Sequence, residues 1–209
     1  MPLDEQLITL LHDHPVALVV VDLQNDFCHP EGLFGRAGKD LTLPQRAVRS
    51  ATELVAACRE AGAMIVWVQQ GTEPDGASDS DAWFRYKVRD GKDPEYTLTG
   101  SWGHAIVDEL EPRTGEVRML KYRSDSFHRT PLDTLLTARG IRTVVLCGVN
   151  TEGCVDATLR STLFHDYFCI LVEDAIGSPN PDSHEAALSI MRTRHDLTTV
   201  GELRDAFAR

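Results

Sequence analysis

The sequence lacks the long apolar run that a membrane span needs, and it lacks the features of an export signal. Its longest apolar runs, such as Val16–Val21 and Thr143–Val149, are far shorter than the roughly 20 residues that cross a bilayer. The amino-terminal segment carries Asp4, Glu5 and Asp13 but no lysine or arginine, unlike the basic start of a secretion signal. We therefore expect a cytoplasmic protein with no membrane partner.

Positive charge is also scarce, with 21 Lys and Arg against 32 Asp and Glu, a net charge of −11. This balance argues against a surface that binds nucleic acid or anionic lipid. It says little about a small substrate, because one buried arginine or lysine can bind an anion inside an acidic protein. Neither G-x-G-x-x-G nor a P-loop occurs, so no phosphate-binding fingerprint is present.

The five cysteines include no C-x-x-C pair, which argues against a disulfide framework or a structural zinc site. Cys58, Cys147 and Cys169 lie in apolar segments and are expected to be small buried hydrophobic residues. Cys154 differs, because it follows the turn after an apolar run. If Thr151 is the N-cap of the next helix, Cys154 lies in the first helical turn, where the helix dipole favours a thiolate. A buried core cysteine is the alternative.

Apolar, β-branched runs alternate with helical patterns along the chain, which predicts one α/β domain over residues 1–209 with a mainly parallel sheet between two helical layers. The expected strands are Ala17–Val21, Met64–Gln69, Val117–Leu120, Thr143–Val149, Phe168–Val172 and a weaker one near Leu197–Val200. The expected helices are Pro44–Ala61, one from Pro131 to Gly140, Val155–His165, Pro181–Arg194 and Gly201–Phe207.

Sites in such sheets lie beyond the carboxyl ends of the strands. There the sequence has Asp22, Lys121 and Cys154: a carboxylate, a cation and a nucleophile. Taken singly, Asp22 also fits a helix cap or ion pair, and Lys121 a solvated loop residue. The stretch from Gly71 to Gly103 is long and polar, so we expect a lid or a pocket wall.

Three ordered motifs add a family resemblance. They are Asp22-Leu-Gln-Asn-Asp-Phe27, Lys121-Tyr-Arg-Ser-Asp-Ser-Phe127 and Gly148-Val-Asn-Thr-Glu-Gly-Cys154-Val155. From about Pro15 onward the chain resembles the isochorismatase-like cysteine hydrolases, which have a Rossmann-type α/β/α fold. The Gly100–Leu110 stretch and the C-terminal half resemble ureidoacrylate amidohydrolases and biuret hydrolases. The element around Cys154 is closer to carbamoylsarcosine and maleamate amidohydrolases.

The resemblance implies an Asp22–Lys121–Cys154 triad, a cis peptide between Val149 and Asn150, and an oxyanion held by the N–H groups of Cys154 and Asn150. It implies C–N bond hydrolysis of a small amide or ureido substrate through a thioester, in a homo-oligomer. Neither a metal nor an organic cofactor is expected, because the Asp-x-His-x-x-His cluster of nicotinamidases is absent after the second strand.

Four further side chains are candidates for substrate binding. Arg123 suits a carboxylate and Glu152 suits a substrate N–H, while Phe27 and Gln69 complete the expected pocket. Two other functions remain open at this stage: a non-catalytic relative that kept the fold, and a redox sensor that uses Cys154. The intact triad argues against the first, and the lack of a second cysteine at close spacing argues against the second.

Overall fold

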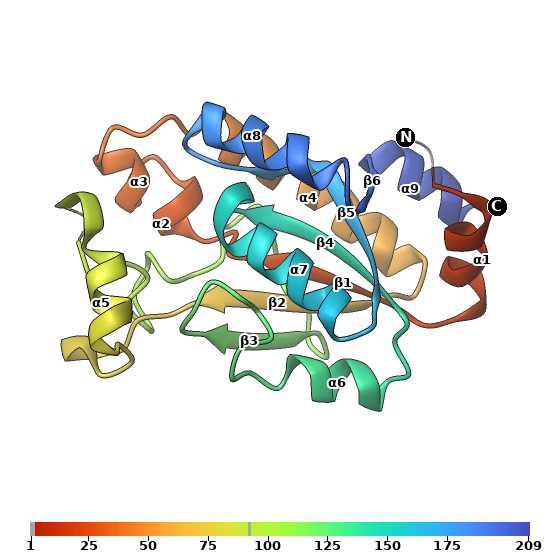
Figure 1. Ribbon diagram of the computed structural model, residues 1–209, viewed down its shortest axis with the longest axis horizontal. Coiled ribbons are helices and arrows are strands. Elements are labelled where there is room, and N and C mark those ends of the chain that lie inside the picture. Colours follow the sequence, from red (N-terminus) through yellow and green to blue (C-terminus); the bar gives the residue numbers. More distant parts are fainter. Residues whose placement is uncertain (1–2, 92) are drawn as a thin grey trace.

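The computed structural model, described over residues 3–91 and 93–209, has a six-stranded parallel sheet with strand order β3-β2-β1-β4-β5-β6 (Figure 1). The strands are β1 (Val16–Val21), β2 (Met64–Gln70), β3 (Val117–Lys121), β4 (Thr143–Val149), β5 (Phe168–Gly177) and β6 (Asp196–Thr198). From β1 the chain adds β2 and β3 on one side of the sheet and then β4, β5 and β6 on the other. Ligands of doubly wound folds bind at this switch point, between β1 and β4. The predicted α/β sandwich is confirmed.

Helices cover both faces of the sheet. One face carries α1 (Glu5–Asp13), α4 (Thr42–Glu60) and α9 (Val200–Phe207), and the other carries α6 (Leu132–Ala138), α7 (Asp156–Phe164) and α8 (Pro181–Met191). Strand β1 is apolar throughout because both of its faces are buried. Leu18 packs with the first set of helices and Val19 with the second. No helix within the described residues is both long enough and apolar enough to span a bilayer.

Several boundaries differ from the sequence prediction. Helix α1 was missed; Asp4 caps it by accepting a hydrogen bond from the Leu7 backbone N–H at 2.9 Å. The last strand, β6, ends at Thr198 rather than Val200, because a capping box between Thr199 and Glu202 starts α9 at once. Strand β5 runs five residues beyond the predicted Val172, to Gly177, and is irregularly paired with β4.

The stretch from Gly71 to Gly103 contains α5 (Asp81–Lys87) and two short 3₁₀ turns, η1 (Pro74–Gly76) and η2 (Arg89–Gly91). Two other short helices, α2 (Asn25–Cys28) and α3 (Leu33–Arg36), follow β1. In Figure 1 the arrows of β2, β3 and β4 point toward α2, α3 and α5, whereas both chain termini lie at the opposite end. These three helices therefore surround the carboxyl edge of the sheet.

Candidate active site

Three side chains meet at the carboxyl ends of β1, β3 and the segment after β4. The Nζ of Lys121 donates to Asp22 Oδ2 at 2.8 Å and to Cys154 Sγ at 3.2 Å. Gln70 Oε1 at 3.0 Å and the carbonyl oxygen of Arg123 at 3.2 Å accept from the same ammonium. Asp22 is 1% exposed and Lys121 0%, so the pair is shielded from water. The fold thus brings together the residues that the sequence places at separate strand ends.

The backbone around Asp22 is unusually constrained. Asp22 has a φ of 54°, in the left-handed region that aspartate visits more readily than most residues. Its N–H donates to the carbonyl of Val68 at 2.9 Å. On the neighbouring strand Gly148 has a φ of 131°, and a Cβ there would lie 2.0 Å from the carbonyl oxygen of Val21. Only glycine allows β4 to pass so close to the turn that orients Asp22.

Cys154 lies in η3, a π-helical turn (Thr151–Val155) between β4 and α7. The residue that caps this turn is Asn150, so the prediction of Thr151 as N-cap was wrong. The Thr151 hydroxyl is instead hydrogen-bonded to Nδ1 of the buried His184 of α8 at 2.7 Å. A tertiary contact has replaced the local cap and anchors the turn that carries the cysteine.

Burial dominates the electrostatics of the triad. It raises the pKa of Asp22 above its usual value, and the Lys121 ammonium only partly offsets this. For Lys121 burial acts to lower the pKa, but Asp22 and Cys154 outweigh it, so the pKa is raised and the amine is protonated. Burial, reinforced by Asp22, raises the pKa of Cys154 to about 12.

The resting cysteine is therefore a thiol at neutral pH, in contrast to the thiolate that its position near a helix start predicts. A proton acceptor is needed before it can attack. Within the described residues, Asp22 Oδ1 is buried and has no hydrogen-bond partner. The carboxylate thus keeps one oxygen unused while its other oxygen is held by Lys121.

A cavity of about 90 Å³ opens onto Cys154. Its walls combine aromatic side chains with a few polar groups, as in most small-molecule sites. It is lined by Phe27, Leu33, Phe34, Gln70, Trp83, Tyr86, Lys87, Tyr96, Ser124, Asn150, Gly153 and Cys154. Four of these residues, from Trp83 to Tyr96, belong to the stretch between Gly71 and Gly103, which therefore forms a pocket wall as the sequence predicts.

The residues proposed for substrate binding fall into two groups. Phe27 and Asn150 line the cavity, and the peptide bond between Val149 and Asn150 is cis. Arg123 is not among the lining residues; its Nη1 donates to backbone carbonyls, and its guanidinium lies 5.0 Å from the ring of Trp83. Glu152 accepts a hydrogen bond from Ser178 at 2.9 Å, also outside the cavity lining.

Gln70, and not the predicted Gln69, lines the cavity at Cys154. The amide of Gln69 donates to the carbonyl of His104 at 2.9 Å and lines a different cavity, whereas Gln70 binds Lys121 and lines the cavity at Cys154. Successive residues of a strand point to opposite faces, and β2 continues through Gln70. The strand end predicted at Gln69 was one residue short, which hid the role of its neighbour.

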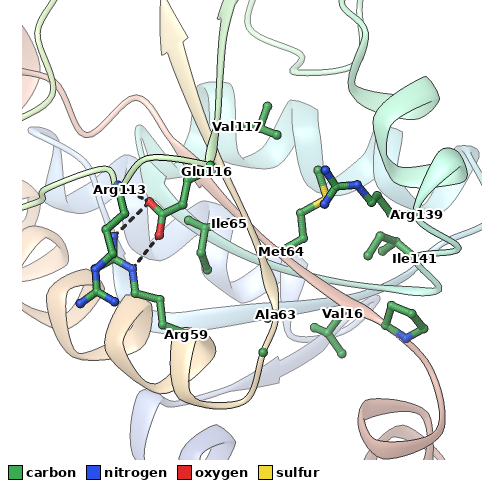
Figure 2. Close-up of a pocket in the computed structure, with 13 residues that line it drawn as sticks. Val16, Arg59, Ala63, Met64, Ile65, Arg113, Glu116, Val117, Arg139 and Ile141 are labelled. Carbon is green, nitrogen blue, oxygen red and sulfur yellow. Dashed lines mark hydrogen bonds and ion pairs between the residues drawn. The ribbon is translucent and has the colours of Figure 1, made fainter.

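A second, larger cavity of about 440 Å³ lies at the opposite edge of the sheet, where β1, β2 and β3 begin (Figure 2). Arg59 and Arg113 group around Glu116, and Arg139 lies across the cavity near Met64. Glu116 accepts hydrogen bonds from Arg59 Nε at 2.7 Å and from the Arg113 N–H at 2.8 Å. Glu116 and Arg59 thus form a structural ion pair. Among the described residues, no cysteine, serine or lysine lines this cavity.

Over residues 3–91 and 93–209, no group of three or more His, Cys, Asp or Glu side chains is arranged to hold a metal ion. The segment after β2, residues 71–74, contributes Glu73, which accepts hydrogen bonds from Tyr122 at 2.7 Å and Thr99 at 3.0 Å. These contacts lower the pKa of Glu73 below its usual value, and the side chain is engaged within the protein.

Comparison with known proteins identifies the family of the chain. Residues 16–202 match the family described as Isochorismatase domain. The chain belongs to the isochorismatase family. A ureidoacrylate amidohydrolase RutB of Methylobacterium radiotolerans is 37% identical over 187 residues, which cover 84% of this chain and 72% of that protein. The relative's name identifies a hydrolase of C–N bonds other than peptide bonds, and this family member is an enzyme of that class.

Solved structures of the isochorismatase family share the fold. A family protein from Desulfovibrio vulgaris has a TM-score of 0.80 and 28% identity, covering 94% of this chain and 100% of its own. N-carbamoylsarcosine amidase from Thermoplasma acidophilum has a TM-score of 0.69 and 28% identity, covering 89% of this chain and 96% of its own. The family resemblance read from the three sequence motifs is thus confirmed.

Proposed function

We propose that this isochorismatase-family enzyme is a cysteine amidohydrolase in which Cys154 is the nucleophile. The observation that carries the proposal is the Lys121 ammonium, which contacts both Asp22 at 2.8 Å and Cys154 at 3.2 Å. Asp22 takes the thiol proton on its unpaired oxygen, and the sulfur attacks the substrate carbonyl. Lys121 stabilises the negative charge as it passes from carboxylate to sulfur.

The remaining steps use the same groups. Attack forms a C–S bond, and Asp22 returns its proton to the leaving ammonia or amine as the C–N bond breaks. The product is a thioester, or a thiocarbamate when the substrate is a ureido compound. Asp22 then deprotonates a water molecule that attacks this carbonyl, and the released sulfur recovers the proton as a thiol. The N–H groups of Asn150 and Cys154 hold the oxyanion, a contribution typically of about 3 kcal/mol per donor.

The substrate is a small amide or a ureido or carbamoyl compound, and hydrolysis releases ammonia or carbamate. The names of the relatives, ureidoacrylate amidohydrolase and N-carbamoylsarcosine amidase, support this class. The 90 Å³ cavity supports a small molecule, and its aromatic walls suit a planar ureido or amide group.

An ammonia-release screen tests the proposal. The panel contains ureido acids, biuret, N-carbamoyl amino acids, maleamate and simple aliphatic amides, each with the wild type and with Cys154→Ala. We expect at least one compound to release ammonia with the wild type and none with the variant. Equal release by Cys154→Ala would refute the nucleophile assignment.

We also propose that the protein forms a homo-oligomer. Phe84 and Tyr86, on the helix that walls the cavity, and Trp102 beyond it are large apolar side chains that remain exposed in the single chain. Such residues are enriched at protein interfaces. Sedimentation equilibrium of the wild type and of Phe84→Ser tests this proposal, since a monomeric wild type would contradict it. The cytoplasmic location expected from the sequence stays a prediction.

A further inference from the structure

The cavity of about 440 Å³, which we call the amino-edge cavity, lies where β1, β2 and β3 begin and takes no part in the proposed chemistry (Figure 2). Its size falls in the range of about 300–1,000 Å³ that is usual for small-molecule sites. The floor is apolar and includes the first residue of each of the three strands, Val16, Met64 and Val117. Met64 and Val117 are only half-buried, so the cavity presents apolar surface to solvent.

Three arginines from separate segments line the same cavity. Arg59 belongs to α4, Arg113 to the turn before β3, and Arg139 caps the end of α6. Among the described residues of the lining, Glu116 is the one carboxylate, so two positive charges have no counter-charge in the wall. This excess arises in a chain whose net charge is −11. Like charges gathered at one place repel each other, and a bound anion relieves that repulsion.

The acceptors of Glu116 are already in use. Its carboxylate accepts from Nε and Nη2 of Arg59 at 2.7 and 3.0 Å. It also accepts from Trp67 Nε1 at 2.7 Å and from the backbone N–H of Arg113 at 2.8 Å. Over the described part of the chain, Arg113 and Arg139 make their hydrogen bonds through the backbone, and no protein acceptor binds either guanidinium. Both residues are exposed, so these donors are reachable from solvent.

The two available arginines lie on different sides of the floor. In Figure 2, Arg113 is grouped with Glu116. Arg139 lies across the cavity, beside Met64. A guanidinium presents a planar fork of N–H donors that matches a carboxylate. A molecule that satisfies both arginines therefore carries an anionic group at each end, and the apolar floor between them favours hydrocarbon in its middle.

We propose that the amino-edge cavity binds a small organic dicarboxylate, with one carboxylate on Arg113, the other on Arg139 and the hydrocarbon chain against the floor at Met64. The site goes beyond the proposed hydrolase function, since it shares no lining residue with the cavity at Cys154. The dicarboxylate is thus a second ligand of the enzyme, bound at the edge of the sheet opposite to the reacting sulfur.

Calorimetric titration of the wild-type protein with α,ω-dicarboxylates tests this site. The probes are succinate, adipate and suberate, each compared with the monocarboxylate of equal chain length, which is butanoate, hexanoate or octanoate. These compounds contain no C–N bond, so the proposed hydrolase activity does not consume them. We expect one diacid, selected by the spacing of the two arginines, to bind at least about 10-fold more tightly than its monoacid, as for one added hydrogen bond to a charged group.

Single substitutions then identify the two ends of the site. Arg113→Met and Arg139→Met should each lower the affinity for that diacid at least about 10-fold, to the level of its monoacid. Both variants should keep the urea midpoint of the wild type, because the two side chains are exposed. Arg49→Met removes the same charge from an exposed arginine that lines neither cavity, and it should leave the affinity unchanged.

Three results would overturn the assignment. Equal affinities of every diacid and its monoacid would exclude a site with two cationic ends. A loss on Arg49→Met as large as that on Arg113→Met would show that only the net charge of the protein matters. A loss of the same size on Tyr86→Ala would place the probe in the cavity at Cys154, which Tyr86 lines.

Discussion

The Asp22–Lys121 pair allows stability and activity to be separated by mutation. The two side chains are 2.8 Å apart and essentially unexposed. Lys121→Met deletes the cation and leaves a buried carboxylate, together with Gln70 Oε1, without its donor. Removing one partner of a buried pair costs about 3–5 kcal/mol of unfolding free energy. The double variant Asp22→Asn with Lys121→Met has no buried charge and should lose only about 1–2 kcal/mol for its hydrogen bonds.

The double variant should therefore be more stable than the single Lys121→Met variant by about 2 kcal/mol in urea unfolding at pH 8. Neither variant should hydrolyse substrate, because the proton acceptor or its stabilising cation is missing. Lys39→Met is the matched control, since Lys39 is exposed, and it should change neither quantity. If the single variant were inactive merely because it is unfolded, the more stable double variant would regain activity.

The pH dependence follows from the sign of the shift. Burial already raises the folded-state pKa of Asp22 above its ordinary 3.8, and Lys121→Met removes the cation that lowers it. A carboxyl with a raised folded-state pKa costs no stability below its unfolded pKa and loses stability as the pH rises through the folded value. The defect of Lys121→Met should thus be small near pH 4 and grow toward pH 8. A defect independent of pH, or equal stability of the single and double variants, would refute this reasoning.

Four further results are expected. Cys154→Ser should be folded but inactive, measured by circular dichroism and ammonia release, because a serine hydroxyl is much harder to deprotonate at this site. The alkylation rate of Cys154 by iodoacetamide should rise steadily from about pH 7 to about pH 10, since its pKa is raised to about 12; a plateau near pH 7 would contradict this. Activity should survive exhaustive chelation, and loss that zinc or manganese restores would show a metal site. Gly148→Ala should lose about 3 kcal/mol or more in urea unfolding, whereas Gly201→Ala, with open space around it, should be nearly neutral.

The sequence predicts the position of the site because a parallel sheet brings all strand ends to one edge. Asp22, Lys121 and Cys154 each follow or end a buried run, so their meeting requires only the strand order and not the details of packing. The register within a strand is harder to predict, because a boundary error of one residue exchanges the two faces. That is why Gln69 was chosen in place of Gln70.

The sequence predicts that the stretch from Gly71 to Gly103 walls the pocket, but it does not predict which of its residues face the cavity, because they acquire their roles only through contacts within an irregular stretch. Nothing in the local sequence distinguishes Lys87 from a solvated lysine; its burial depends on Asp79, eight residues earlier, and on Thr72, two residues after β2. The protonated state of Cys154 was missed for a similar reason. Its helical position was weighed without the depth of burial that raises its pKa to about 12.

The first sequence motif, residues 22–27, connects the proposed proton acceptor Asp22 to the cavity wall formed by residues 71–103. After Asp22, three polar side chains of the motif hydrogen-bond the chain that leads into or out of the wall. The Nε2 of Gln24 donates to the carbonyl oxygens of Gln70 at 3.0 Å and His104 at 2.7 Å, and the Nδ2 of Asn25 donates to that of Trp102 at 2.9 Å.

Asp26 completes this arrangement. Its carboxylate accepts from the backbone N–H of Thr97 at 2.7 Å and from that of Leu33 at 3.0 Å, which ties the wall to α3. Gly103 packs against the same carboxylate so closely that a Cβ would lie 2.4 Å from Asp26 Oδ2. A motif that contained only the proton acceptor would need no further polar residues after Asp22. Because the same short segment carries Asp22 and is hydrogen-bonded to the wall, the distance between the proposed proton acceptor and the cavity wall is set by one continuous piece of chain.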